Sequence, residues 1–148
     1  MTETPVSETL NITVSRRIEA VPSAVFDAWL APERVARFLF ATPEGRMEAV
    51  SLDPWVGGAF HISERRGQIL AEHSGQFLVL DRPNRIAFTF SAGSHSAPTR
   101  VDVAIADEAG GSLVTLSHEI DPQWSPHADR VRGSWASILD SLARTIED

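Results

Sequence analysis

His118 is the side chain of this sequence best placed for proton transfer near neutral pH, the range in which histidine changes its charge. It lies in the segment 113–120, where apolar and polar residues alternate, and it falls on the same side as Leu116 and Ile120. That alternation predicts a strand with His118 pointing inward. Two interpretations follow: a pocket histidine that contacts a ligand or acts as a general acid or base, and a neutral core histidine satisfied by the protein. The pattern favours the core histidine over a catalytic one, and supports ligand contact and plain packing equally.

A metal site built on histidines is the second candidate for chemistry. His61 and His73 lie on neighbouring predicted strands. Zinc would need both of them and His118 on one face of the sheet. His61, however, alternates with Phe60 and Ile62, which places it on the face opposite to these apolar neighbours. We therefore expect no metal, and nothing else in the sequence indicates a cofactor.

Other polar side chains would contribute only from inward positions. Glutamates on strands could act there as an acid or a base, but exposure is their usual state. Histidines in a loop or a first helical turn are expected to be exposed. Strand arginines could pair with a carboxylate ligand, although solvated arginines are commoner. The glutamates are Glu64 and Glu72, and the histidines are His95 in the loop and His127 in the helical turn. The arginines are Arg16, Arg65 and Arg85.

Aromatic residues are numerous enough to line a cavity, since the chain has four tryptophans and seven phenylalanines. Inward aromatic side chains are a usual lining of ligand sites. Ordinary core packing must account for most of them, and Trp29, Trp55 and Trp124 share both interpretations. The predicted ligand-binding residues face the centre of the sheet or close its mouth: Phe38, Phe40, Phe60, Ile62, Phe77, Phe88, Phe90, His118 and Trp135.

The composition excludes several classes of function. The net charge of −7 argues against a nucleic-acid partner. The absence of lysine, cysteine and tyrosine excludes Schiff-base lysines, thiol nucleophiles, cysteine metal sites and tyrosine acids. No phosphate loop, nucleotide fingerprint or Ser-His-Asp order occurs. Because no apolar run approaches the ~20 residues of a membrane span and the first residues are acidic, we expect a cytoplasmic protein with no membrane partner.

Hydrophobic periodicity predicts the elements that must position these residues. One strand is followed by two short helices that begin at prolines, then by six strands with short connections. Gly75 predicts a bulge, and the segment 91–98 a flexible loop. The expected ranges are 10–18 for the first strand, 22–30 and 32–39 for the helices, and 47–52, 59–65, 69–80, 85–90, 99–106 and 113–120 for the later strands.

The terminal segment 125–148 predicts a long amphipathic helix. Ser125 can cap its first turn and Pro126 can occupy its first position. Gly133 is its weak point, at a cost of ~1 kcal/mol against alanine. A helix of about 22 residues is ~33 Å long, so it must lie across a large apolar surface. Its apolar stripe consists of Val131, Trp135, Ile138, Leu139, Leu142 and Ile146.

These elements predict one architecture. Six strands with short connections form an antiparallel meander, which the first strand joins through a helical crossover. Only the terminal helix is long enough to cover the apolar face. We therefore predict an α+β fold in which a curved seven-stranded antiparallel sheet surrounds the long C-terminal helix, with two short helices after the first strand. We also expect a single domain over 10–148 and a flexible tail over 1–9.

The order of the elements and several local strings resemble a known family. From about residue 10 to 147 they are similar to the heat-shock-protein-90 ATPase activator homologue family in its short bacterial form. The resemblance implies the helix-grip fold of the START-like (SRPBCC) superfamily, which includes the birch pollen allergen. The segments that carry it are 25–29 (VFDAW) with Pro32 and Glu33, Asp53 with 56–58 (VGG), 75–90 (GQFLVLDRPNRIAFTF), 112–118 (SLVTLSH), and Trp135 with Ile138, Leu139 and Leu142.

The resemblance implies less about function than about fold. The superfamily binds hydrophobic small molecules in a cavity, and some members are cyclases or hydrolases. We therefore predict a binding domain for a small hydrophobic ligand between the sheet and the C-terminal helix. One alternative is a chaperone-associated interaction module, since the family is named after a co-chaperone. The other is a cyclase or hydrolase that uses His118, and a homodimer is left open.

Overall fold

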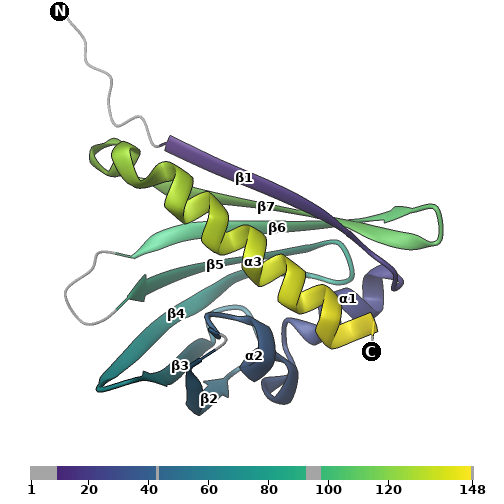
Figure 1. The fold of residues 1–148 in the computed structure, drawn as a ribbon. Helices are drawn as coiled ribbons and strands as arrows, with labels where there is room; N and C mark the ends of the chain where they lie inside the picture. The colour runs from purple at the N-terminus through teal and green to yellow at the C-terminus, as the bar shows by residue number, and fades with distance from the viewer. Residues whose placement is uncertain (1–9, 43, 93–97, 148) are drawn as a thin grey trace, which may run out of the picture.

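A curved, seven-stranded antiparallel sheet grips one long helix in the computed structural model of this chain, which describes residues 10–42, 44–92 and 98–147 (Figure 1). This arrangement confirms the predicted helix-grip fold. The strands are β1 (Leu10–Ile18), β2 (Arg46–Leu52), β3 (Ala59–Arg66), β4 (Ile69–Asp81), β5 (Arg85–Ala92), β6 (Thr99–Glu108) and β7 (Gly111–Ile120). The helices are α1 (Pro22–Ala28), α2 (Pro32–Phe38), the 3-10 helix η1 (Pro122–His127) and α3 (Ala128–Glu147).

The strand order shows how the chain closes around its helix. The order is β1-β7-β6-β5-β4-β3-β2, with every neighbouring pair antiparallel. β2 to β7 form the predicted meander. β1 pairs along its whole length with β7, from Leu10 opposite Ile120 to Ile18 opposite Ser112. The chain therefore passes from one edge strand to the other through α1 and α2, and both of these short helices contact α3.

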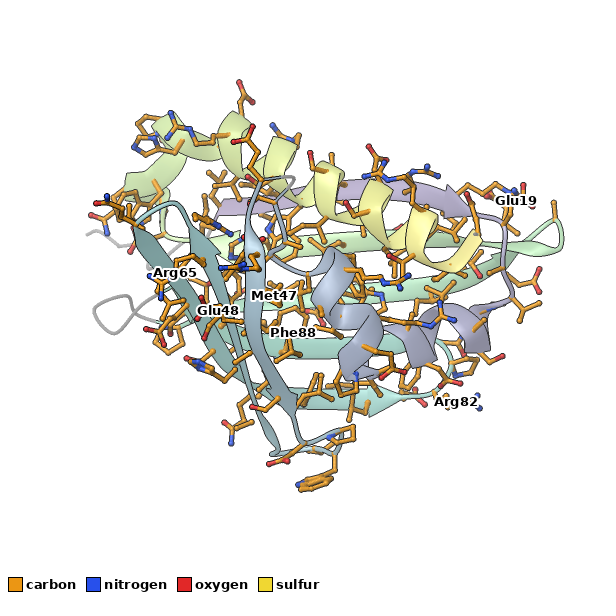
Figure 2. The ribbon with its side chains drawn as sticks, turned by 60° about the horizontal axis from the view of Figure 1, so that its bottom comes forward. Glu19, Met47, Glu48, Arg65, Arg82 and Phe88 are labelled. Carbon is orange, nitrogen blue, oxygen red and sulfur yellow. The ribbon has the colours of Figure 1, made fainter. Side chains whose placement is uncertain are left out.

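The core lies between the concave face of the sheet and α3, which runs diagonally across that face (Figure 1). Phe88 of β5 lies in this interior, whereas Arg82 and Glu19 lie at the periphery (Figure 2). The predicted stripe of α3 faces the core throughout. Its buried members are Trp135, Ile138, Leu139 and Leu142, and its partly buried members are Val131 and Ile146.

The predicted start of the long helix is wrong. The chain first forms η1, whose N-cap residue Asp121 accepts a hydrogen bond from the Gln123 amide at 3.0 Å. Pro126 lies inside η1, and α3 begins at Ala128. An internal proline lacks the N–H of an α-helical turn and crowds the preceding turn, so regular α geometry starts only after it. The helix of 20 residues is about 30 Å long.

Gly75 does not form the predicted bulge. It pairs in regular register with β5, and the register shift of β4 lies between Phe77 and Val79. The glycine is required by a close approach instead, because a Cβ atom at position 75 would lie 1.7 Å from the carbonyl oxygen of Thr89. Glycine in a strand marks either a bulge or such an approach, and the sequence alone does not separate the two.

Two sequence predictions fall partly or wholly on residues that the structure does not describe. The segment 91–98 was expected to be a loop, but Ser91 and Ala92 continue β5, and residues 93–97, with His95 among them, lie outside the described residues. The expected tail over 1–9 also lies outside them.

Replacing two glycines by alanine should change the stability in opposite directions. Gly133→Ala adds a methyl group to an exposed helical position with no atom within 4 Å, so the free energy of unfolding should rise by about 1 kcal/mol. Gly75→Ala forces β4 and β5 apart and should lower it by about 1–3 kcal/mol. Urea unfolding measures both changes. A Gly75→Ala variant as stable as the parent would contradict the close approach of the two strands.

Candidate functional site

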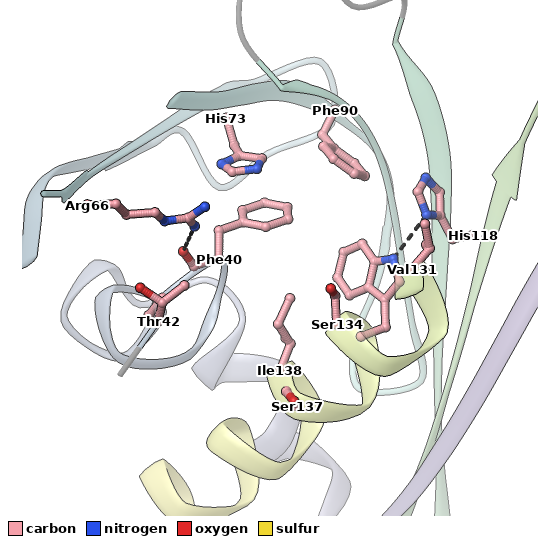
Figure 3. A pocket seen from close by; sticks show the side chains of 12 residues that line it. Phe40, Thr42, Arg66, His73, Phe90, His118, Val131, Ser134, Ser137 and Ile138 are labelled. Carbon is pink, nitrogen blue, oxygen red and sulfur yellow. Dashed lines mark hydrogen bonds between the residues drawn. The ribbon is translucent and has the colours of Figure 1, made fainter. Parts of the chain in front are cut away.

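One cavity of about 440 Å³ remains between α3 and the sheet, partly open to solvent (Figure 3). Its wall combines α3 with β3, β4, β5, β7 and the segment that follows α2. Arg66 and Thr42 lie on one side of it and His118 and Val131 on the other (Figure 3). The lining residues are Phe40, Ala41, Thr42, Arg66, His73, Phe90, His118, Val131, Ser134, Trp135, Ser137 and Ile138.

Two other hollows suit a small ligand less well. The first, beneath the helical arm formed by α1 and α2, has a volume of about 10 Å³, so aromatic packing nearly fills that end of the interior. The second is a broad hollow of about 870 Å³ between η1 and the ends of β5 and β6, and its lining includes the charged Arg100, Glu119 and Asp121. The cavity beside α3 is therefore the candidate site.

Stacked aromatic rings form the apolar wall of the cavity. Phe40 lies parallel to His73, with ring centroids 3.9 Å apart and an interplanar angle of 5°. Its ring also lies 5.1 Å from that of Phe90 and 5.7 Å from that of Trp135. Phe40 has a φ of 58°, a left-handed conformation that costs a bulky residue energy. This conformation turns the chain after α2 so that the ring enters the cavity.

Both ring nitrogens of His118 are engaged by hydrogen bonds. Trp135 donates its indole Nε1–H to Nδ1 of His118 at 3.0 Å, the contact drawn in Figure 3. With Nδ1 accepting, the neutral ring carries its proton on Nε2, which lies 2.9 Å from Oγ1 of Thr99. Burial lowers the pKa of His118 to about 4, so the ring is neutral at physiological pH. The predicted inward position of His118 is thus observed.

His73 is also neutral in this cavity. Burial lowers its pKa to about 4, and the nearby Arg66 cation acts in the same direction while Glu64 opposes it. Its stacking on Phe40 places the imidazole within the aromatic wall. The two histidines therefore present polar but uncharged edges to the cavity at neutral pH.

An ion pair lies on the other side of the cavity. Glu64 is buried, and its carboxylate accepts hydrogen bonds from the Thr42 amide at 2.8 Å, the Thr42 hydroxyl at 3.1 Å and Nε of Arg66 at 2.7 Å. Arg66 also donates from Nη2 to the carbonyl oxygen of Phe40 at 2.9 Å. These bonds fix the segment after α2 against β3, so the expectation that Glu64 is exposed was wrong. Three donors offset the cost of burying the carboxylate.

The structure separates the predicted ligand-binding residues into two groups. Four of them line the cavity: Phe40, Phe90, His118 and Trp135. The other five pack in the core away from it: Phe38, Phe60, Ile62, Phe77 and Phe88. Phe38 is fully buried against Trp29, with ring centroids 5.0 Å apart, and so does not close the mouth.

Several side chains weighed for chemistry lie elsewhere. Trp55 and Trp124 are more than half exposed, and His127 is exposed in η1. No group of three metal-binding side chains occurs within the described ranges. His61 hydrogen-bonds Ser63 and lies 3.4 Å from the half-exposed Glu72. The three arginines weighed as carboxylate binders form ion pairs within the protein, namely Arg16 with Asp140, Arg65 with Glu48 and Arg85 with Asp102.

Sequence reasoning missed the polar lining, although signals for it existed. Glu64 and Arg66 share the strand alternation of Phe60 and Ile62, which predicts inward side chains for both. Ser134 follows Val131 by three residues, which places both on the helical stripe that faces the sheet. Val131 was expected near the cavity and does line it, whereas the missed lining residues are Ala41, Thr42, Arg66, His73, Ser134, Ser137 and Ile138.

No helix in the part of the chain that the structure describes is long and apolar enough to cross a membrane.

Solved structures similar to this chain share its fold. The AHSA1-like protein from Aeromonas hydrophila is 26% identical, with a TM-score of 0.81 over 93% of this chain and 92% of that one. The CV1439 protein from Chromobacterium violaceum is 21% identical, with a TM-score of 0.81 over 93% of this chain and 97% of that one. The SA2116 protein from Staphylococcus aureus is 12% identical, with a TM-score of 0.83 over 95% of both chains.

Sequence comparison gives the family. No protein with curated annotation matches the chain. One family model matches residues 19–147, from the end of β1 to the end of α3, and it is described as Activator of Hsp90 ATPase homolog 1-like protein. This match confirms the resemblance drawn from the local strings. The chain is therefore a member of the Activator of Hsp90 ATPase homolog 1-like protein family.

Proposed function

We propose that this protein binds a small hydrophobic molecule in the cavity between α3 and the sheet. One observation carries the proposal: the hollow beneath α1 and α2 is nearly filled by aromatic packing, whereas about 440 Å³ beside α3 is bounded by the rings of Phe40, Phe90 and Trp135. A volume of this size is typical of small-molecule sites. An apolar molecule placed there would remove these rings from water, which favours binding.

Catalysis by His118 is the weaker interpretation of the same cavity. A general base needs a free lone pair, and the Nδ1 lone pair already accepts from Trp135. Its Nε2–H is directed at Thr99 instead of the cavity centre. We therefore assign His118 the role of fixing Trp135, and through it α3, against β7.

A protein-interaction role is the second candidate, and one surface feature favours it. Trp55 and Val56, in the turn between β2 and β3, are 59% and 61% exposed. Adjacent exposed apolar side chains of this size often mark a contact site. Neither residue lines the cavity, so a protein partner at this turn would leave the cavity open.

Filling the cavity should weaken ligand binding. The uncharged dye N-phenyl-1-naphthylamine, whose emission rises in apolar surroundings, serves as the probe. Ser134→Trp puts an indole into the cavity and should weaken dye binding by at least about tenfold. Ala136→Trp, an exposed position of α3 outside the cavity lining, is the matched control and should bind as the parent does. Equal affinity in all three proteins would contradict binding in this cavity.

His118 should make the stability depend on pH. Its pKa is lower in the folded chain, about 4, than the ordinary 6.5, so between these values the unfolded chain binds the extra proton. The neutral His118 therefore makes its full contribution to the free energy of unfolding above pH 6.5. About 3 kcal/mol of that contribution is lost as the pH falls to 4. Urea unfolding at pH 7 and 4 should show the advantage of the parent over His118→Gln shrinking by about that amount. A constant difference would contradict a buried, neutral His118.

The chaperone alternative makes a separate prediction. If the turn contacts the heat-shock-protein-90 chaperone of its host, a complex should form between the purified proteins in sedimentation velocity runs. Replacing both Trp55 and Val56 by serine should remove it, because the exposed apolar contact is lost. Val21→Ser, at another exposed apolar position, should not. Absence of any complex with the parent chain would rule out this role.

A further inference from the structure

Arg66 has one donor nitrogen that the protein does not use. Its Nε is bonded to Glu64 and its Nη2 to the carbonyl oxygen of Phe40. Within the described residues, no hydrogen bond involves Nη1, and Arg66 is part of the cavity lining. Figure 3 shows the guanidinium beside Phe40, on the side of the cavity opposite to His118. A fixed guanidinium with a spare N–H is suited to hold one acceptor atom of a ligand.

The charge around this nitrogen favours a neutral acceptor. Glu64 accepts a hydrogen bond from Nε of Arg66 at 2.7 Å, and its side chain is only 3% exposed. The Arg66–Glu64 pair therefore has no net charge, and within the described residues no other charged side chain lines the cavity. A carboxylate ligand at Nη1 would lie close to the Glu64 carboxylate in a partly buried site, where like charges repel strongly. A carbonyl oxygen would gain the hydrogen bond without that repulsion.

The remaining wall fits an apolar body attached to such an oxygen. Phe40, Phe90 and Trp135 present rings to the cavity, and Ile138 presents an aliphatic side chain from α3. Flat aromatic bodies stack well against walls of this kind. The cavity of about 440 Å³ has room for two or three fused rings with a short substituent.

We propose that the ligand is an uncharged amphipathic molecule, with a flat apolar body against the aromatic wall and a carbonyl oxygen that accepts a hydrogen bond from Nη1 of Arg66. This inference rests on the proposed function, since it names the chemical class of the molecule that the cavity binds. It makes Arg66 the residue that selects a ketone or amide over a hydrocarbon and over a carboxylate.

Three probes with one bicyclic body test the inference by isothermal titration calorimetry. 2-Acetylnaphthalene carries the carbonyl acceptor, 2-isopropenylnaphthalene replaces that oxygen by a methylene group of similar shape, and 2-naphthoate carries a negative charge. The ketone should bind about tenfold more tightly than either of the others, the effect expected for one hydrogen bond to a charged donor.

Variants assign the preference to Arg66. Replacing Arg66 alone would leave Glu64 buried without its cation, so the double variant Glu64→Gln, Arg66→Met removes both charges together. It should bind the ketone and the alkene equally. Arg65→Met is the matched control, because Arg65 is the neighbouring arginine of β3 and pairs with Glu48 instead (Figure 2). This control should keep the tenfold preference.

Each outcome decides one question. A ketone preference lost only in the double variant supports the inference. Equal binding of ketone and alkene by the parent chain overturns the role of Arg66 but leaves the hydrophobic cavity as proposed, and tightest binding of the naphthoate shows that the site selects anions. Failure of all three probes to bind would contradict the proposed function itself. The dissociation constants of the three probes, measured with the parent chain, distinguish these outcomes even if the double variant does not fold.

Discussion

Burial of the apolar stripe of α3 is the constraint on which the rest of this structure depends. A helix about 30 Å long with Trp135, Ile138, Leu139 and Leu142 on one side has to be covered along its whole length. A flat sheet would cover it poorly, whereas the curved meander surrounds it. The helical arm completes the cover at the C-terminal half of α3, where Leu142 is fully buried.

The cavity exists because the elements that pack against α3 differ between its two halves. Beneath the arm, the rings of Trp29, Phe38 and Phe88 pack so closely that almost no space remains. Near the start of α3 the arm no longer covers the helix, and hydrogen bonds hold the walls of the cavity in place. The Arg66–Glu64 pair anchors the segment after α2, and the Trp135 indole anchors α3 to His118. Walls held in this way cannot collapse without breaking hydrogen bonds that are buried or partly buried.

These same bonds are the reason why we propose binding and not proton transfer for the cavity. Two histidines and a buried glutamate give it the residues of a general acid–base site. Each of them, however, already has partners: His118 has Trp135 and Thr99, Glu64 has Thr42 and Arg66, and His73 stacks on Phe40. Polar groups used in this way shape a site and set its polarity, whereas no hydrogen bond within the described residues uses Nη1 of Arg66.

Sequence patterns were enough to predict the fold, because each element has a periodic apolar pattern and the short connections between β2 and β7 allow only a meander. The sequence also determined that His118 points inward and that the α3 stripe faces the core, since both follow from local alternation. It did not determine whether Gly75 marks a bulge or a close approach, nor which aromatic residues border a cavity, because Phe60 and Phe90 have the same inward alternation. The folded chain shows that Phe60 packs against Phe77 and Phe88 in the core, whereas Phe90 lines the cavity. The reason is physical: a cavity is the volume that packing leaves between elements distant in sequence, and no single segment encodes it.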